Sequence, residues 1–144
     1  ERGPYQAIVL PHSGAYRGIH NKIDSVMAGI TKHQINATIA IGVYYDDPAK
    51  VPIADLRSEA GFIISDSVVM DPPFRTIKIP ARHVLLAAIK ANPALAGFKT
   101  YPALKNWIDK NQIQVDTTQA IVERYHPDGL VEVELAITDT TGRP

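Results

Sequence analysis

The chain contains no cysteine. This absence excludes a disulfide framework, a thiolate zinc site and a cysteine nucleophile, and it leaves the redox compartment open. An excess of charge of one sign is also absent, because 15 Lys and Arg residues balance 15 Asp and Glu residues. Domains that bind nucleic acid usually carry a basic surplus, so we expect no direct contact with nucleic acid.

Long apolar runs are missing as well. No stretch approaches the ~20 apolar residues of a membrane-spanning helix, and the first residues lack the pattern of a signal peptide. We therefore expect no membrane contact by this segment. The chain reaches an apolar stretch a few residues after Glu1. This suggests a soluble domain with an earlier strand or anchor left out, either cytoplasmic or part of a membrane-anchored protein.

Common catalytic and metal-binding motifs are absent too. The five histidines show no ligand spacing such as H-x-H or H-E-x-x-H, so we expect no metal. The sequence has no G-x-S-x-G elbow, no G-x-G-x-x-G loop and no P-loop. We therefore expect neither a serine hydrolase nor a nucleotide site, and no cofactor.

Residues 39–64 predict two strands joined by an acidic turn. Apolar residues alternate with others in residues 39–45 and again in residues 59–64, which is the period of half-buried strands. Pro48 and Pro52 lie between the two segments and lack the N–H that a strand donates. The chain must therefore turn between them.

The segment before this hairpin predicts a strand and a helix. Residues 5–10 form a strand pattern that Pro11 should end. Apolar residues from Tyr16 to Ile30 then recur at the three-and-four spacing of one helical face. The residues around Ser13 can cap this helix, and Met27 belongs to the stripe that we expect in the core.

The second half of the chain repeats this order. It predicts a strand at 74–79, an apolar run at 83–90 that fits either a strand or a helix, and a helix around Pro102. Trp107 should lie on the buried side of that helix. A hairpin over residues 118–137 completes the order.

The half-length repetition suggests a duplication within one domain. A chain of 144 residues has the usual size of a single domain. We predict one domain over residues 1–144 with pseudo-repeats at about 1–66 and 74–139. The fold class is α+β, with duplicated βαββ halves that form a curved, mainly antiparallel sheet. Helices should cover one face, and a central cleft should lie between the halves.

Side-chain alternation predicts a site on the open face of this sheet. Apolar residues of each strand should point to the helices, so the alternate residues line the uncovered face. We expect Tyr44 to match Tyr125 and Glu59 to match Glu132 in the two halves. Aromatic walls around a carboxylate suit a cationic, aromatic or amphipathic small molecule. The predicted ligand-binding residues are Tyr44, Glu59, Ile63, Trp107, Tyr125, Glu132 and Glu134.

A second interpretation of these carboxylates needs no ligand. Acidic residues on an exposed sheet face commonly solvate that face and pair with basic neighbours such as Arg57 or Arg124. The alternation alone does not separate this interpretation from a binding site.

One motif carries a resemblance to a known family. The segment GVYYDDP, followed by VP and by DLRSEAGFII, resembles the hairpin of GyrI-like domains, the effector-binding modules of BmrR-type and Rob-type regulators. Tyr44, Pro52 and Glu59 match the first repeat of the family pattern, and Tyr125 and Glu132 match the second. The segment HSGAY also resembles the family's H-x-G-P-Y turn. The second repeat departs from the pattern, because ANPA stands where G-P-Y is usual.

The resemblance implies a cleft that binds small, often cationic or aromatic, ligands, with Glu132 at the position of the family's buried glutamate. It also implies an alternative, hydrolysis by a Tyr125 and Glu132 pair. The segments IPARHV and YPALKNWIDKNQ resemble a GyrI-like ectodomain behind a membrane anchor. That resemblance implies a protein-interaction domain. In each case a fused domain or protein partner is expected.

Overall fold

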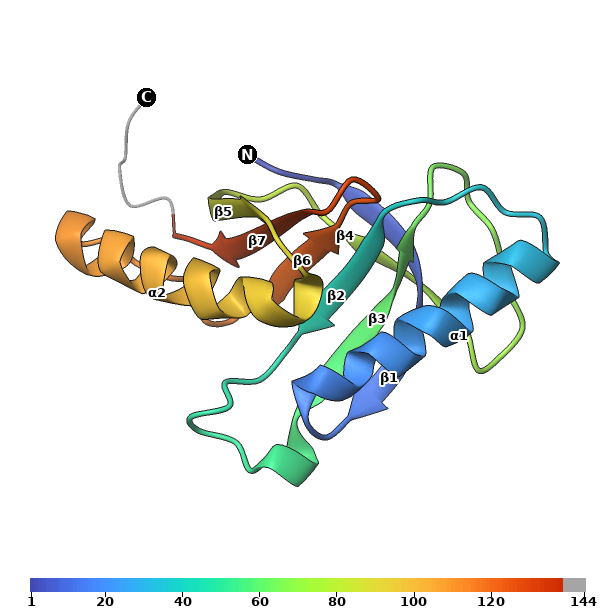
Figure 1. The fold of residues 1–144 in the computed structure, drawn as a ribbon, viewed down its shortest axis with the longest axis horizontal. Coiled ribbons are helices and arrows are strands. Elements are labelled where there is room, and N and C mark those ends of the chain that lie inside the picture. Colours follow the sequence, from blue (N-terminus) through green and yellow to red (C-terminus); the bar gives the residue numbers. More distant parts are fainter. Residues whose placement is uncertain (139–144) are drawn as a thin grey trace.

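The computed structural model describes residues 1–138 as one seven-stranded sheet with two helices on one face (Figure 1). The elements are β1 (Tyr5–Ser13), η1 (Tyr16–Gly18), α1 (Ile19–Lys32), β2 (Ala40–Tyr44), η2 (Ile53–Asp55), β3 (Arg57–Ile63), β4 (Arg75–Ile79), β5 (Val84–Lys90), α2 (Pro93–Asn111), β6 (Ile121–Tyr125) and β7 (Leu130–Ala136). This architecture confirms the predicted α+β class. None of the helices in this part of the chain is long and apolar enough to cross a membrane.

The strand order is β4-β1-β3-β2-β6-β7-β5, and all neighbours are antiparallel. The predicted hairpins are present as β2–β3 and β6–β7. A βαββ order occurs twice, as β1-α1-β2-β3 and as β5-α2-β6-β7, and the pairing of β2 with β6 joins the two groups. Descent of these groups from a duplication stays a prediction. Residue 139, the predicted end of the second repeat, lies outside the described residues.

The helices pack on one face of the sheet, and α1 buries most of the apolar stripe that the sequence predicts. Val26 and Ile30 of α1 pack on Ile8 and Phe62 of the sheet. On the other half, α2 packs its own small and apolar residues on β7. Each helix therefore covers its own part of the sheet, and the β2–β6 pair lies between them.

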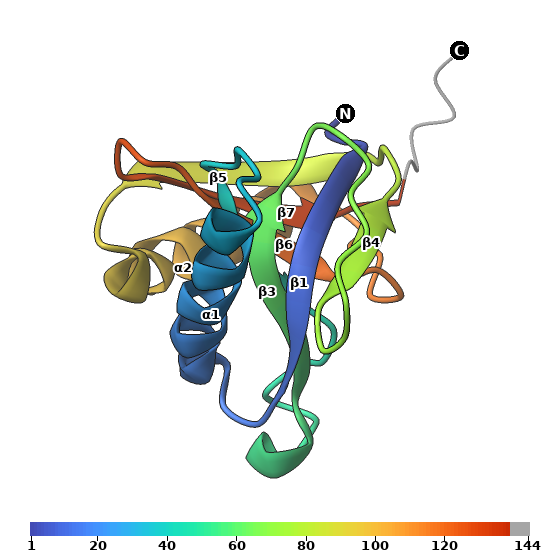
Figure 2. The same ribbon diagram turned by 90° about the vertical axis from the view of Figure 1, so that its right-hand side faces the viewer.

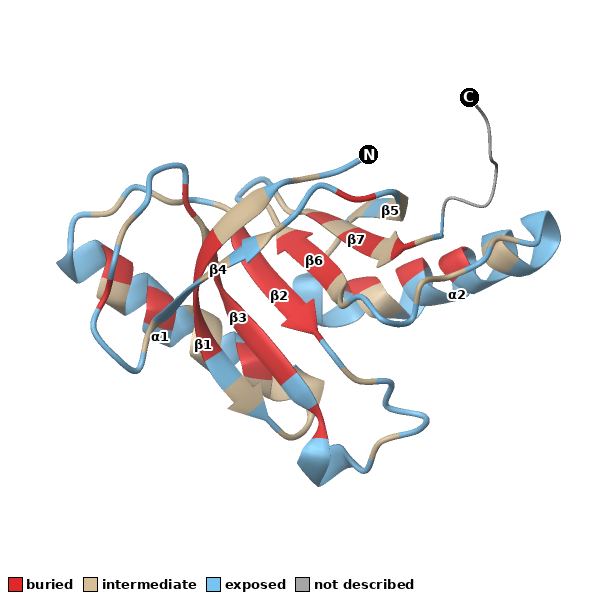
Figure 3. Ribbon diagram, turned by 180° about the vertical axis from the view of Figure 1, so that it is seen from behind, coloured by how far each residue is buried: buried red, intermediate tan, exposed pale blue. Residues whose placement is uncertain are grey.

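The face without helices is also buried along its centre, which the alternation argument did not predict. Figure 3 shows buried residues along β1, β2, β3 and β6 from this side. A second apolar cluster fills it, made of Ala7, Val9, Ile41, Val43 and Val122. The cluster is shielded because the sheet curves around it. Figure 2 shows the strands of the second half running across the direction of β1 and β3.

A hydrogen bond across the sheet shows how strong this curvature is. The hydroxyl of Tyr5 on β1 donates to Glu134 Oε2 on β7 at 2.5 Å. Four strand spacings separate β1 from β7, which in a flat sheet amounts to about 19 Å. Side chains of this length reach each other only because the sheet curls. The helix-free face is therefore concave.

Two predicted strand features need correction. Pro11 does not end its strand, because β1 continues to Ser13. β4 pairs with β1 only up to Val9, so β1 is an edge strand at Pro11. No carbonyl group of a neighbouring strand needs the N–H that proline lacks there. The ambiguous run at 83–90 is a strand, because every residue of β5 pairs with β7.

Three helix predictions are also wrong in detail. Met27 is 42% exposed and Trp107 is 54% exposed. Trp107 lies in the last turns of α2, which extend past the sheet (Figure 1). Ser13 belongs to β1 and does not cap a helix, since α1 starts after Gly18 without a side-chain cap. Pro102 lies inside α2, which runs through it as one helix, in agreement with the helix predicted around this residue.

Candidate functional site

A cavity of about 680 Å³ lies between α1 and α2, on the side of the sheet that carries the helices. Residues of η1 and α1 form one wall, and the first turns of α2 form the other. β2 and β6 provide the floor, and residues 45–48 and 115–119 complete the rim. The cavity thus lies over the joint between the two halves of the sheet.

Two tyrosines meet on the floor. The hydroxyl oxygens of Tyr44 and Tyr125 lie 2.8 Å apart. The β2–β6 register pairs Tyr44 with Ile121 and Ala40 with Tyr125. The backbones of the two tyrosines are therefore offset by four residues along the paired strands. The ring of Tyr44 closes this gap by lying over Gly42, where a β-carbon would meet the Tyr44 hydroxyl at 2.7 Å. Glycine at this position therefore allows the two phenols to meet.

Glu123 lies between these tyrosines, opposite Gly42 in the register, and is 8% exposed. Tyr101 of α2 donates its hydroxyl to Glu123 Oε2 at 3.1 Å. Burial raises the pKa of the Glu123 carboxyl, while hydrogen bonds from Tyr101, Tyr44 and Tyr125 partly offset that rise. Among residues 1–138, no lysine, arginine or histidine forms an ion pair with Glu123. The cavity therefore holds a desolvated carboxyl group without a cation.

The tyrosines around Glu123 stay neutral at physiological pH. Burial raises the pKa of Tyr44, Tyr101 and Tyr125 above the usual phenol value. Tyr16 adds a fourth ring, packed edge to face on Tyr44 with 4.8 Å between ring centroids. Its hydroxyl donates to the carbonyl of Asp46 and accepts from the amide of Asp46. These phenols present aromatic faces and hydroxyl donors to a ligand.

The rim is acidic. Its lining carries Asp46, Asp47 and Asp116 against one arginine and one histidine, and Asp46 is ion-paired with Arg57, so the negative charge comes mainly from Asp47 and Asp116. Arg57 donates two side-chain hydrogen bonds to Asp46 and holds the pKa of that carboxyl below its usual value. Hydrogen bonds from Thr118 and Gln119 likewise lower the pKa of the Asp116 carboxyl. Ionised carboxylates at the mouth favour the approach of cations.

The structure brings only two of the predicted site residues into this cavity, Tyr44 and Tyr125. Five do not line it: Glu59, Ile63, Trp107, Glu132 and Glu134. The prediction placed the strand residues together in a trough on the helix-free face. Glu59, Ile63, Glu132 and Glu134 do project from that face, but Tyr44 and Tyr125 do not, so the predicted grouping is wrong. Tyr44 and Tyr125 project from the helix side, whereas the strand residues among the five project from the concave side.

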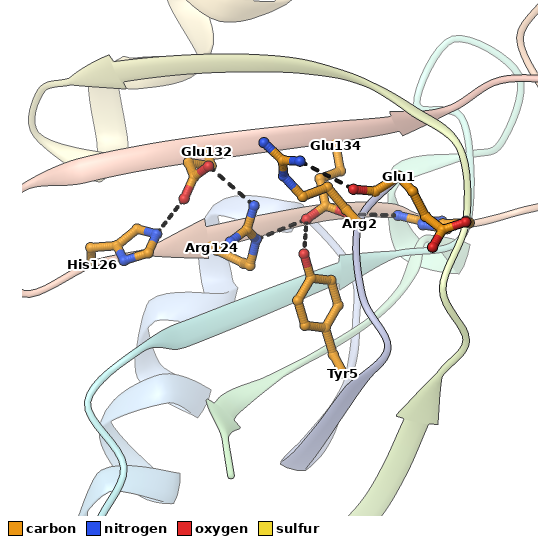
Figure 4. Close-up of polar contacts among 8 residues, drawn as sticks. Glu1, Arg2, Tyr5, Arg124, His126, Glu132 and Glu134 are labelled. Carbon is orange, nitrogen blue, oxygen red and sulfur yellow. Dashed lines mark hydrogen bonds and ion pairs between the residues drawn. The ribbon is translucent and has the colours of Figure 1, made fainter. Parts of the chain in front are cut away.

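Glu134 belongs to a charge network on the concave face (Figure 4). It is fully buried, and Arg124 Nε donates to its Oε2 at 2.8 Å. A nitrogen of Arg82 lies 3.8 Å from its other oxygen. The Tyr5 hydroxyl also donates to Glu134, and burial and this contact raise the pKa of Tyr5 to about 12. The network links β1 to β6 and β7 across the curved sheet.

The other two predicted glutamates have partners of their own. Glu132 Oε2 lies 3.2 Å from Arg124 Nη2, and its other oxygen is bonded to His126 (Figure 4). Glu59 accepts a hydrogen bond from Tyr45 and lies 3.4 Å from a nitrogen of Arg75. These contacts match the second interpretation of the sequence, in which the carboxylates pair with neighbouring side chains.

The Tyr125 and Glu132 pair that the resemblance implied for hydrolysis is not formed. Tyr125 faces the cavity, and Glu132 faces the opposite side of the sheet. Within the cavity, Tyr101 donates its hydroxyl to Glu123 instead. In the part of the chain that the structure describes, no three His, Asp or Glu side chains are grouped so as to hold a metal ion.

Most lining residues were not predicted, and Tyr16, Tyr101 and Glu123 are the functionally important ones among those missed. A signal for Glu123 was present, because residues 121, 123 and 125 of one strand face the same side. Because Tyr125 was placed in the site, Glu123 on the same face of that strand should have been placed there too. Nothing local to Tyr101 shows that α2 lies beside β6, so sequence reasoning had no signal for it.

A family profile described as "GyrI-like small molecule binding domain" matches residues 1–140. No curated protein sequence matches the chain significantly. The profile covers all the elements that build the cavity.

Solved structures share the fold at low sequence identity. The EcmrR chain in a cryo-EM structure of an EcmrR–DNA complex (EcmrR-RPo) has a TM-score of 0.68 and 13% identity, over 92% of this chain and 54% of that one. This chain thus spans about half of the EcmrR chain. SAV2435 bound to tetraphenylphosphonium has a TM-score of 0.61 and 10% identity, over 96% and 91%. A hydrolase from Listeria innocua also has a TM-score of 0.61 with 10% identity, over 94% and 88%.

Proposed function

The chain belongs to the family of GyrI-like small-molecule binding domains, and we propose that its ligand is an organic cation with apolar or aromatic groups. The observation that carries this proposal is the carboxyl group of Glu123, buried among phenols without an ion-pair partner in the described residues. Burying a carboxylate without a partner is unfavourable, and a bound cation relieves that cost. The surrounding aromatic faces add cation–π attraction.

The size and the charge of the cavity support the same ligand class. Its volume of about 680 Å³ falls within the ~300–1,000 Å³ typical of sites for small organic ligands. The acidic rim favours cations over anions. SAV2435, which shares the fold, binds tetraphenylphosphonium, a cation with four aromatic groups. We propose that Tyr44 and Tyr125 contact the apolar part of the ligand and that Glu123 balances its charge.

A partner that responds to the bound ligand is part of this proposal. The match covers about half of EcmrR, whose structure is a DNA complex, so the domain also occurs within a longer chain. We propose that occupancy of the cavity is sensed by a fused domain or a separate protein.

Calorimetry with a charged and a neutral probe tests the ligand class. Tetraphenylphosphonium should bind the wild-type protein, and neutral triphenylphosphine oxide should bind at least about tenfold more weakly, because a charge-assisted contact contributes about 1.5–3 kcal/mol. Glu123→Gln should remove this preference for the charged probe.

Glu132→Gln is the matched control, since it makes the same chemical change on the opposite face of the sheet. It should leave both affinities within about twofold, a change of about 0.4 kcal/mol. Equal binding of the two probes by the wild-type protein, or an unchanged preference in Glu123→Gln, would contradict the proposal.

Hydrolysis in the same cavity is a second candidate, and the contact between Tyr101 and Glu123 favours it. A carboxyl group whose pKa is raised by burial suits general acid–base catalysis. The test is hydrolysis of p-nitrophenyl esters by wild type, Glu123→Gln and Tyr101→Phe. If all three proteins hydrolyse the esters at the rate of buffer alone, this candidate fails for ester substrates.

A further inference from the structure

An exposed aromatic side chain borders the cavity on α2. Phe98 is 78% exposed. It follows Ala94 by four residues and precedes Tyr101 by three, and both of these residues line the cavity. Residues at such spacings are neighbours on one helix surface. Phe98 therefore extends the apolar wall of the cavity outward to the crest of α2.

The opposite wall has a similar extension on α1. Met27 is 42% exposed and lies seven residues after His20, which lines the cavity. Seven residues are nearly two helical turns, so both side chains lie on the same side of α1. Phe98 thus borders the cavity, and Met27 lies about 10 Å farther along α1 than the cavity wall, both outside the space that a small ligand would fill.

Charge complementarity defines the chemistry of a partner for this surface. The rim presents Asp46, Asp47 and Asp116, and the floor presents Glu123. A partner must therefore bring positive charge to the centre and apolar groups to both sides. A free organic cation confined to the cavity would leave Phe98 and Met27 uncovered. A polypeptide segment extends in two directions from each side chain and so covers both.

We propose that the cavity receives a lysine or arginine side chain of a protein partner, whose flanking apolar residues pack on Phe98 and Met27. The inference rests on the proposed function, because it keeps Glu123 as the partner of the cation. It adds that the cation is carried by an extended polypeptide. The aromatic rings of the floor then surround the side-chain cation as they would a free one.

Short capped peptides test this interaction surface. The probes are acetyl-Gly-Leu-Lys-Leu-Gly-amide, its arginine counterpart and its glutamine counterpart, with tetraphenylphosphonium as the small cation. Calorimetry should show that at least one basic peptide binds about tenfold or more tightly than the glutamine peptide. Phe98→Ala should lower the affinity for that basic peptide by about fivefold or more and leave the affinity for tetraphenylphosphonium within about twofold.

Trp107→Ala is the control, because Trp107 is an exposed aromatic residue on the same helix outside the cavity. It should change neither affinity. If tetraphenylphosphonium binds but neither basic peptide does, or if Phe98→Ala weakens both probes equally, the polypeptide inference is overturned while the proposed function stands. If neither the small cation nor the peptides bind, both fail.

Discussion

Glu123 is the residue at which burial and charge oppose each other. Burial raises the pKa of its carboxyl in the folded protein, so the folded state holds this proton more strongly than the unfolded chain. Protonated Glu123 therefore contributes to the free energy of unfolding. This contribution is fully present below the unfolded pKa of about 4.3 and is lost as pH rises through the folded pKa. Ionised Glu123 therefore destabilises the ligand-free domain at neutral pH.

Glu123→Gln should consequently stabilise the domain at pH 7, and the gain should shrink as pH approaches 4. Thermal unfolding between pH 4 and pH 8 measures it, with a shift in Tm of roughly 2–4 °C for each kcal/mol. Asp109→Asn, which alters an exposed carboxylate on α2, should change Tm little at any of these pH values. A gain for Glu123→Gln that does not vary with pH would contradict the assigned cause.

The site residues show what alternation can and cannot predict. Tyr44 and Tyr125 were identified from matching positions in the two hairpins, and both line the cavity. Glu132 was chosen because it matches Glu59 of the first hairpin and the glutamate of the family pattern, and the matching did not test which face of the sheet it lies on. Val122 on the concave side is fully buried, and Ile121 on the helix side is also packed. When both faces of a strand are apolar, the pattern does not tell which face carries the site.

Among the elements, the β1–β3 pair is closely packed at Gly61. A β-carbon at Gly61 would lie 1.8 Å from the carbonyl oxygen of Ile8. That atom belongs to the backbone of the neighbouring strand, so it cannot rotate away. Gly61→Ala should lower the free energy of unfolding by about 3 kcal/mol or more, at the upper end of overpacking effects, as measured by urea denaturation.

Gly97→Ala is the control for this substitution. Gly97 lies in α2, where an added β-carbon would meet the Tyr101 ring at 3.4 Å, and alanine favours a helix over glycine by up to about 1 kcal/mol. Its stability should equal or exceed that of wild type. A Gly61→Ala protein as stable as the Gly97→Ala protein would refute the assigned clash.

Local sequence patterns predicted most elements, and tertiary pairing decided the others. Both hairpins and the α1 stripe follow from alternation and helical spacing. The apolar run that forms β5 was ambiguous, because its residues fit both the strand period and the helix period. Its pairing with β7 shows that it is a strand. Pro11 was misread since the rule against proline applies to strands paired on both sides.

At the scale of the whole molecule, buried charges on the concave face bridge strands that the curvature of the sheet brings together. Glu134 is the shared partner of Arg124, Arg82 and Tyr5. Removing one member of a buried ion pair typically costs about 3–5 kcal/mol, because the remaining charges stay buried. Glu134→Gln should therefore destabilise the domain by a similar amount in urea denaturation.

An exposed ion pair provides the comparison. Lys105 and Asp109 lie 3.0 Å apart on the surface of α2, and such pairs contribute about 0.3–0.5 kcal/mol. Lys105→Gln should thus have little effect in the same assay. If Glu134→Gln is no more destabilising than Lys105→Gln, the buried network does not hold the sheet in its curved form.

The fold class was predictable at this scale, and the curvature was not. The order of strands and helices can be read along the chain, residue by residue. The approach of β1 to β7 depends on Tyr5 meeting Glu134, 129 residues later. Such a contact leaves no periodic signal near either residue, so the buried concave face was missed.

The β2–β6 joint also determines when the cavity forms during folding. Each of these strands has a hairpin partner nearby in the chain, whereas the two tyrosines on the floor are 81 residues apart. Closing so long a loop is entropically costly, so we expect the hairpins to form before the two halves dock. The cavity therefore exists only in the fully docked protein. A ligand that binds there slows unfolding without accelerating the formation of either hairpin.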